Sequence, residues 1–209
     1  MSLARRERLA LVDSMTAAGP EAPTLCGGWT VRDLAAHLVV RERRMDASPG
    51  IMLKPLAGYL NSVQAKAAQR PFEQLLEQIR TGPPWWSPMR PLDSLVNLSE
   101  MYVHHEDVRR GAPGWKPREL PASDEAELWN TLRRMAKLAY RKSPVGLALA
   151  TPDGQRVIAH SPAAGEDPVV LTGPPSELVL HAFGRNAVRL DATGPEAAVQ
   201  AVDACDRSI

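Results

Sequence analysis

The sequence predicts a mainly α-helical protein in which a helical bundle is followed by a small α/β module. Through about the first two thirds of the 209-residue chain, apolar residues recur at the three- and four-residue spacing of amphipathic helices. Beyond Pro144, short apolar runs replace this spacing, and the turn-forming pair Asp153-Gly154 separates two of them. We therefore expect one domain over residues 1–143 and a second domain over residues 144–209.

The helices of the first domain are marked by their boundary residues. Apolar residues at helical spacing cover residues 3–18, and Gly19 ends that pattern. Thr30 and Asp33 have the spacing of a capping box, so we expect the second helix to begin there and to continue to about Asp46. Further helices are expected at residues 54–69, 71–82, 92–111 and 123–141.

The C-terminal module combines strands with short helices. Its apolar runs are bounded by Gly and Pro, and several are too short for a helix of ordinary length. Strands are expected at residues 145–150, 156–160, 169–171 and 187–192, and helices at residues 175–183 and 195–204.

The composition argues against several classes of function. The formal net charge is +1, so the chain has no overall positive excess for a nucleic-acid partner. Residues 1–144 hold 21 basic and 16 acidic side chains, whereas residues 145–209 hold 4 and 8, which marks a change of module. Cys26 and Cys205 are too few for a disulfide framework, and no apolar run approaches the roughly 20 residues of a membrane span. The N-terminus lacks the apolar segment of a signal peptide, so we expect a cytoplasmic protein.

The segment from Glu100 to Asp107 carries the residues that most clearly predict chemistry. On a helix, Glu100, His104 and Asp107 share one face, because residues three and four positions apart are neighbours there. His37, on the second expected helix, offers another imidazole. Two imidazoles and one carboxylate leave positions open on a bound cation, as in catalytic zinc sites, and iron or nickel accept the same donors. Cys26 is a candidate additional ligand, although a buried neutral thiol is the simpler interpretation.

Each of these residues also has a purely structural interpretation. His37 lies at the edge of an apolar helix face, where a hydrogen-bonded core histidine is common. Glu100 and His104 can form an ordinary i,i+4 pair worth a few tenths of a kcal/mol, and Asp107 can pair with a neighbouring arginine. The neighbours of Glu100 are largely apolar, however, and a cation would offset the unfavourable burial of its carboxylate. His105 faces away from this set and is expected at the surface or behind the ligands.

Two motifs resemble those of a known family. The stretch GWTVRDLAAH at residues 28–37 and the pattern Glu100-x-x-x-His104-x-x-Asp107 resemble the metal-binding domain of mycothiol-dependent maleylpyruvate isomerases. These belong to the DinB/YfiT-like group, and the resemblance implies an up-down four-helix bundle. It also implies that His37, Glu100 and His104 hold a divalent metal, zinc being expected, and that Asp107 has a catalytic role.

The C-terminal module resembles the α/β domain of the same family. The resemblance rests on residues 173–185, which end in a Gly-Arg pair. In that family the arginine of this pair lies in the active site, which implies that Arg185 binds a substrate carboxylate. The bundle resemblance covers about residues 3–142, and the chain is most similar to an actinobacterial subgroup of metal-binding proteins.

The resemblance implies mycothiol as a cosubstrate that adds to an unsaturated diacid and leaves after cis–trans isomerisation. We therefore expect a divalent-metal-binding protein that acts with this thiol as an isomerase or transferase on a small electrophile. It would act as a monomer or homodimer, without nucleic-acid or membrane partners. Two alternatives stay open, a metal-dependent hydrolase that uses a bound hydroxide and a non-catalytic metal-binding or ligand-sensing protein.

Overall fold

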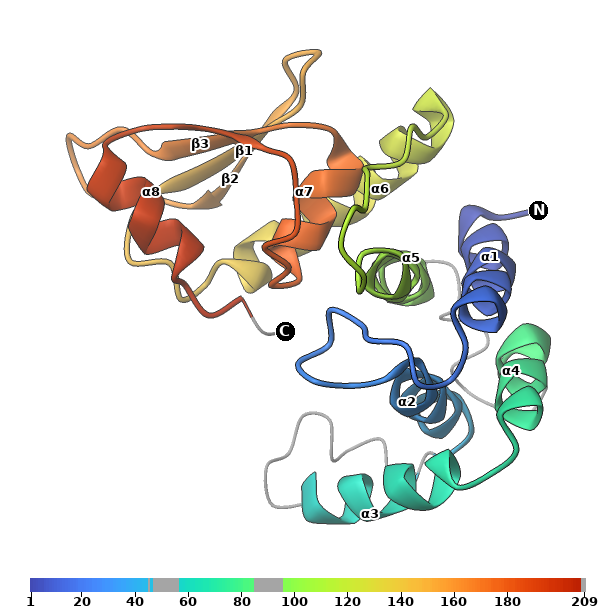
Figure 1. Ribbon diagram of the computed structural model, residues 1–209. Coiled ribbons are helices and arrows are strands. Elements are labelled where there is room, and N and C mark those ends of the chain that lie inside the picture. Colours follow the sequence, from blue (N-terminus) through green and yellow to red (C-terminus); the bar gives the residue numbers. More distant parts are fainter. Residues whose placement is uncertain (45, 47–56, 85–95, 208–209) are drawn as a thin grey trace. The chain divides into compact units, whose positions relative to one another are not determined.

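The computed structural model describes residues 1–44, 46, 57–84 and 96–207 of the chain. Contacts within the chain divide it into two compact units, Met1–Trp115 and Lys116–Ile209. The first unit is built from helices, and the second combines helices with one small sheet (Figure 1). The predicted fold class, mainly α with a C-terminal α/β module, is confirmed.

The first unit contains five helices among its described residues. They are α1 (Leu3–Ala18), α2 (Val31–Arg43), α3 (Ala57–Ala68), α4 (Phe72–Thr81) and α5 (Val96–Arg109). Helix α1 packs against α4 and α5, while α2 packs against α3 and α4 (Figure 1). Their apolar faces meet in a core to which Leu11, Leu34, Leu75 and Met101 belong. The up-down order of four helices stays a prediction.

Helix starts in this unit follow the capping residues of the sequence. Ser2 accepts a backbone hydrogen bond from the first turn of α1, and α1 ends at Gly19, whose φ of +84° suits glycine best. At the start of α2, the Thr30 hydroxyl accepts from the Asp33 N–H at 3.3 Å. The Asp33 carboxylate accepts in turn from the Thr30 N–H at 3.0 Å, which confirms the predicted capping box. His37 therefore lies about two turns into a helix with a fixed start.

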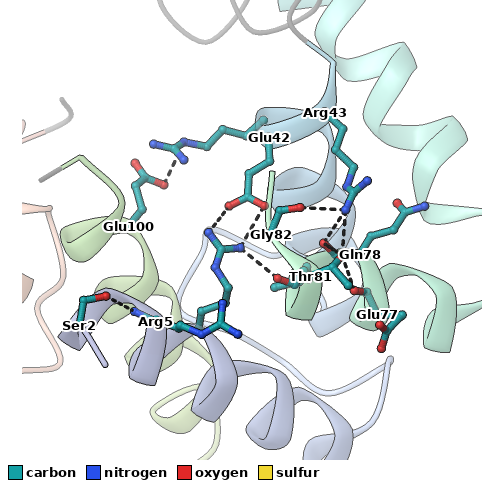
Figure 2. Close-up of polar contacts among 12 residues, drawn as sticks. Ser2, Arg5, Glu42, Arg43, Glu77, Gln78, Thr81, Gly82 and Glu100 are labelled. Atoms are coloured by element: carbon teal, nitrogen blue, oxygen red, sulfur yellow. Dashed lines mark hydrogen bonds and ion pairs between the residues drawn. The ribbon is translucent and has the colours of Figure 1, made fainter. Parts of the chain in front are cut away.

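Charged side chains join α1 and α4 to α2 (Figure 2). The buried guanidinium of Arg8 donates to both carboxylate oxygens of Glu42, at 3.0 and 2.5 Å, and to the carbonyl of Ile79 at 3.0 Å. Arg43 donates to the carbonyls of Gln78 and Gly82 at 3.1 and 2.8 Å. These contacts fix the C-terminal half of α2, which begins at the turn that carries His37.

The second unit places a four-stranded sheet beside three helices. Its elements are α6 (Ala122–Ala139), β1 (Leu147–Ala150), β2 (Arg156–His160), β3 (Val169–Thr172), α7 (Pro175–Ala182), β4 (Asp191–Thr193) and α8 (Glu196–Asp203). The strand order is β2-β1-β3-β4, in which β1 is parallel to β3 and the other two pairs are antiparallel. The apolar face of α6 packs against α7 and β2.

The contacts and the sequence pattern divide the chain at different places. The sequence pattern changes at Pro144, where strands replace helices, whereas the contacts separate the units after Trp115. The difference concerns α6, which is helical like the first unit but contacts elements of the second. Periodicity shows that a helix has an apolar face, but it does not show which neighbour covers that face.

Among the described residues, no helix combines the length and the apolar character that crossing a membrane requires.

Candidate metal centre

Three predicted ligands converge in the first unit. His37 comes from α2, and Glu100 and His104 come from α5. One donor atom from each lies within 4.8 Å of the other two. Glu100 Oε2 is 3.4 Å from His104 Nε2, and the centres of the two imidazole rings are 5.7 Å apart. Because metal–ligand bonds are about 2 Å long, donors of one cation lie within roughly 4 Å of one another, which small side-chain rotations reach here.

Two of these residues are held in the form that binds a cation. Burial, together with the charges of His104 and Arg41, lowers the pKa of His37 to about 4 against the opposing effect of Glu100. Burial acts to raise the pKa of Glu100, but the hydrogen bond and charge of His104 and the charges of Arg41 and His37 prevail and lower it to about 2. At neutral pH, His37 therefore offers a lone pair and Glu100 a carboxylate.

His104 lies between two carboxylates of its own helix. Burial acts to lower its pKa, but hydrogen bonds with Asp107, Cys26 and Glu100 raise the pKa of His104 well above its ordinary 6.5. Its Nδ1 lies 2.9 Å from Oδ2 of Asp107, a fully buried residue. This is the arrangement in which a carboxylate orients a metal-binding histidine from behind. A catalytic role for Asp107 stays a prediction.

Two contacts of the site were not anticipated from the sequence. Arg41 Nε lies 3.5 Å from Glu100 Oε2, an ion pair between α2 and α5 (Figure 2). Arg41 stands one turn after His37, so the i,i+4 spacing was a usable signal for it. Gln64, on α3, has its side-chain nitrogen 2.7 Å from His37 Nδ1. A half-turn of the amide presents its oxygen instead, so that Nδ1 donates and Nε2 keeps the lone pair for a cation. No local sequence pattern marks Gln64.

His105 is not at the surface, one of the two places expected for it. The residue is 4% exposed, and its ring contacts two side chains of α1. Nδ1 is 2.8 Å from Glu7 Oε2, and Nε2 is 2.9 Å from Ser14 Oγ. Both ring nitrogens are thus used by α1. The helical periodicity gave the direction of the side chain correctly, away from Glu100, but could not show that α1 covers that direction.

Arg185 belongs to the second unit and follows Gly184, whose φ is +81°. Its Nη1 donates to the carbonyl of Phe183 at 2.6 Å. The role of Arg185 at the substrate stays a prediction.

Comparisons with known proteins agree with this fold. Residues 1–84 match the family model described as the mycothiol maleylpyruvate isomerase N-terminal domain. A crystal structure of a histidine-to-alanine mutant of the mycothiol-dependent maleylpyruvate isomerase is similar with a TM-score of 0.61 and 16% identity, over 93% of this chain and 92% of that chain. A crystal structure of the mycothiol-dependent maleylpyruvate isomerase gives 0.55 and 17% over the same shares. No curated protein matches the chain.

The chain therefore has the fold of the mycothiol-dependent maleylpyruvate isomerases, since both structures align with it over nearly its whole length. Within this fold, residues 1–84 are similar to the mycothiol maleylpyruvate isomerase N-terminal domain. The matched segment includes His37 and ends before Glu100 and His104. The resemblance predicted from the sequence is confirmed.

Proposed function

We propose that the chain is a divalent-metal-binding enzyme that uses mycothiol to isomerise a small electrophile or to transfer the thiol to it. The observation that most directly supports this is the convergence of His37, Glu100 and His104 within 4.8 Å. Zinc is the cation we expect, and nickel or iron accept the same donors. The names of the matching domain and of the two similar structures support mycothiol as the cosubstrate.

Two of the three ligands already have the protonation state that binds such a cation, and the cation would replace the Nε2 proton of the third, His104. When bound, it would supply the positive charge that stabilises a thiolate near neutral pH. His37 contributes a neutral imidazole and Glu100 a carboxylate. Asp107 accepts the Nδ1–H of His104 and thereby holds the ring with Nε2 directed toward Glu100. The chain's own residues thus orient the donors before any cation arrives.

A groove beside His37 offers room for the thiol or the substrate. Its volume is about 380 Å³, in the range of small-molecule sites. Two of its lining residues contact His37, since Trp29 places its ring centre 5.1 Å from the imidazole and Gln64 lies 2.7 Å from Nδ1. Asp33 and Asn61 also line it. An aromatic surface with amide groups suits a polar, hydrogen-bonding molecule.

Arg185 is proposed to bind a carboxylate of the electrophile. A guanidinium presents its donors as a planar fork that matches the two oxygens of a carboxylate. The Gly184-Arg185 pair corresponds to the family motif on which this proposal rests.

Cobalt substitution tests whether the metal binds a thiol. Thiolate coordination to Co²⁺ produces strong charge-transfer absorption in the near ultraviolet, and the Cys26→Ser protein ensures that this absorption reports the added thiol. Mycothiol should produce the band, His37→Ala should abolish it, and His160→Ala in the second unit should leave it unchanged. Thiol-dependent turnover of maleylpyruvate-like electrophiles would then establish the reaction. An unchanged spectrum at saturating mycothiol would contradict the proposal and favour a non-catalytic metal-binding protein.

A further inference from the structure

His104 is the point at which two different sets of donors meet. Its Nε2 faces Glu100, at 3.4 Å, on the side of the proposed metal centre. Its Nδ1 faces Asp107 Oδ2 at 2.9 Å and Cys26 Sγ at 3.7 Å. The Cys26 thiol donates to the same Asp107 oxygen at 2.9 Å. Cys26 Sγ, His104 Nδ1 and Asp107 Oδ2 thus form a compact triangle on the side of the ring opposite Glu100. All three atoms lie within 4.8 Å of one another.

The position of Cys26 is built into the fold of the loop before α2. The Leu25 N–H donates to the Asp107 carbonyl at 3.1 Å, which ties this loop to the end of α5. The Cys26 N–H donates to the Thr24 hydroxyl at 3.1 Å, so the thiol has a fixed direction. Gly111 lies so close to this loop that a Cβ there would meet the Pro23 carbonyl oxygen at 2.1 Å.

The spacing of this triangle is close to that of a bound cation. Zinc–sulfur bonds are about 2.3 Å and zinc–nitrogen or zinc–oxygen bonds about 2.0–2.2 Å, so tetrahedral ligands lie roughly 3.3–3.6 Å apart. The three separations are 3.7, 2.9 and 2.9 Å, and the two short ones are hydrogen bonds that a cation would open by about half an ångström. Thiolate, imidazole and carboxylate together suit a thiophilic divalent cation.

We propose that Cys26, Nδ1 of His104 and Asp107 form a second cation position, which takes thiophilic divalent ions such as cadmium. On binding, the cation forms bonds to Sγ, Nδ1 and Oδ2, and the thiol proton and the Nδ1 proton pass to the solvent. Asp107 then exchanges two hydrogen bonds for one bond to the cation.

This second position competes with the first for one imidazole. A neutral imidazole carries a single lone pair, so a cation at Nδ1 leaves Nε2 protonated and withdraws His104 from Glu100 and His37. This consequence rests on the proposed metal centre, but the sulfur-containing position itself does not. Thiophilic ions would therefore displace zinc from the first position and abolish the proposed activity of that centre.

Titration of the metal-free protein with Cd²⁺ tests the proposal, because a cadmium–thiolate bond absorbs in the ultraviolet. All variants carry Cys205→Ser, which leaves Cys26 as the chain's one thiol. The absorption should saturate near one Cd²⁺ per chain and disappear with Cys26→Ser. It should persist in His37→Ala, which changes only the first donor set, formed by His37, Glu100 and Nε2 of His104. Circular dichroism verifies that each variant is folded.

Gly111→Ala provides a second variant, in which the three donor residues themselves are unchanged. It should displace the loop that carries Cys26 and weaken Cd²⁺ binding by roughly tenfold or more, comparable to the loss of an outer-shell partner. Absorption that is lost in His37→Ala as fully as in Cys26→Ser would place the cadmium in the first donor set and overturn the proposal. Absence of thiolate absorption in the Cys205→Ser protein would also overturn it.

The fate of zinc separates this proposal from the proposed function. In zinc-loaded protein, Cd²⁺ should release zinc at a lower concentration when Cys26 is present than in Cys26→Ser. If Cd²⁺ gives the thiolate absorption but the protein retains no zinc, the proposed function fails and the second position stands. If zinc binds normally but no thiolate absorption develops, the second position fails alone.

Discussion

Two adjacent histidines of α5 occupy opposite kinds of surroundings. His105 faces α1, where Glu7 and Ser14 use both of its ring nitrogens at 2.8 and 2.9 Å. His104 instead lies between two carboxylates of its own helix, those of Glu100 and Asp107. The two residues are of the same type and adjacent in the sequence. The difference between them therefore arises from the side chains that neighbouring helices place against each ring.

The two adjacent buried carboxylates of α5, those of Glu106 and Asp107, are balanced by different kinds of positive charge. Glu106 is fully buried and paired with two guanidinium groups, those of Arg110 at 2.6 Å and Arg109 at 2.7 Å. A guanidinium keeps its proton under all ordinary conditions, so this cluster is closed to a metal. Beside Asp107, the balancing charge is the His104 imidazolium, whose proton a cation can replace. A buried carboxylate of α5 is therefore accessible to a metal only where its positive partner can lose a proton, whatever the number of charged residues around it.

The largest expected effect is on metal binding. His104→Ala should weaken zinc binding by more than roughly 100-fold, which exceeds the usual effect of an outer-shell partner. His105→Ala should leave zinc binding unchanged, because both nitrogens of His105 are used by α1. Elemental analysis and competition with a chelator measure both. Equal zinc affinity in the two variants would contradict the assignment of His104, and not His105, as a zinc ligand.

In the metal-free protein, both variants should lose stability. His105→Ala removes a buried hydrogen-bond partner from Glu7 and leaves a cavity, so we expect a loss of about 3 kcal/mol. In metal-free protein, His104→Ala removes the protonated ring that faces the fully buried Asp107 carboxylate, so we expect a loss of about 3–5 kcal/mol. Urea unfolding of the metal-free proteins compares the two. Unchanged stability in His104→Ala would show that its ring does not balance the buried Asp107 carboxylate.

His181 in the second unit extends the comparison to a histidine buried without a carboxylate in hydrogen-bonding contact. Burial, with a smaller contribution from the Arg207 charge, lowers the pKa of His181 to about 3. Since the unfolded ring titrates near 6.5, the unfolded chain binds more protons below that pH. The contribution of His181 to stability is therefore complete above pH 6.5 and is lost as the pH falls toward 3, by about 1.4 kcal/mol per unit.

Urea unfolding of wild type and His181→Gln between pH 7 and pH 5 measures this dependence. The wild type should lose stability more steeply than the variant, which has no imidazole at this position. Parallel curves would show that the ring takes up its proton over the same pH range in the folded and the unfolded protein. The hydroxyl oxygen of Tyr140, 2.7 Å from Nδ1, would then accept a hydrogen bond from the protonated ring.

The smallest expected effect concerns the start of α2. Thr30→Ala removes the hydroxyl that caps the Asp33 N–H, for which we expect a loss of about 1 kcal/mol. Zinc affinity should fall less than tenfold, because His37 lies about two turns away from the cap. Thr30→Ser, which keeps a capping hydroxyl, is the matched control and should restore most of the stability.

Much of the fold could be predicted, because helices and strands depend on local pattern. The helix expected at residues 3–18 is α1, and the strand expected at residues 156–160 is β2. The strand expected at residues 187–192 was largely wrong, since β4 covers only Asp191–Thr193. Its partner β3 is four residues long, so the chain is paired only where β3 offers hydrogen bonds. The expected start of α5 near residue 92 lies outside the described residues.

The site was predictable where its residues share a helix or a recognisable motif. Glu100 and His104 follow from i,i+4 spacing, and His37 from the motif that begins α2. The proximity of Cys26 to Asp107 and of Gln64 to His37 could not be predicted. Both contacts join elements far apart in the sequence, and their distances depend on how loops and helices pack rather than on any local pattern.

The capping box at the start of α2 determines the direction in which the His37 side chain leaves the helix. From Thr30, seven residues at about 100° each bring His37 nearly back to the same side of the helix after two turns. One residue inserted between them would turn the imidazole by about 100° while leaving a normal helix. The helical segment between cap and ligand is thus more sensitive to a change of length than to a change of an exposed side chain.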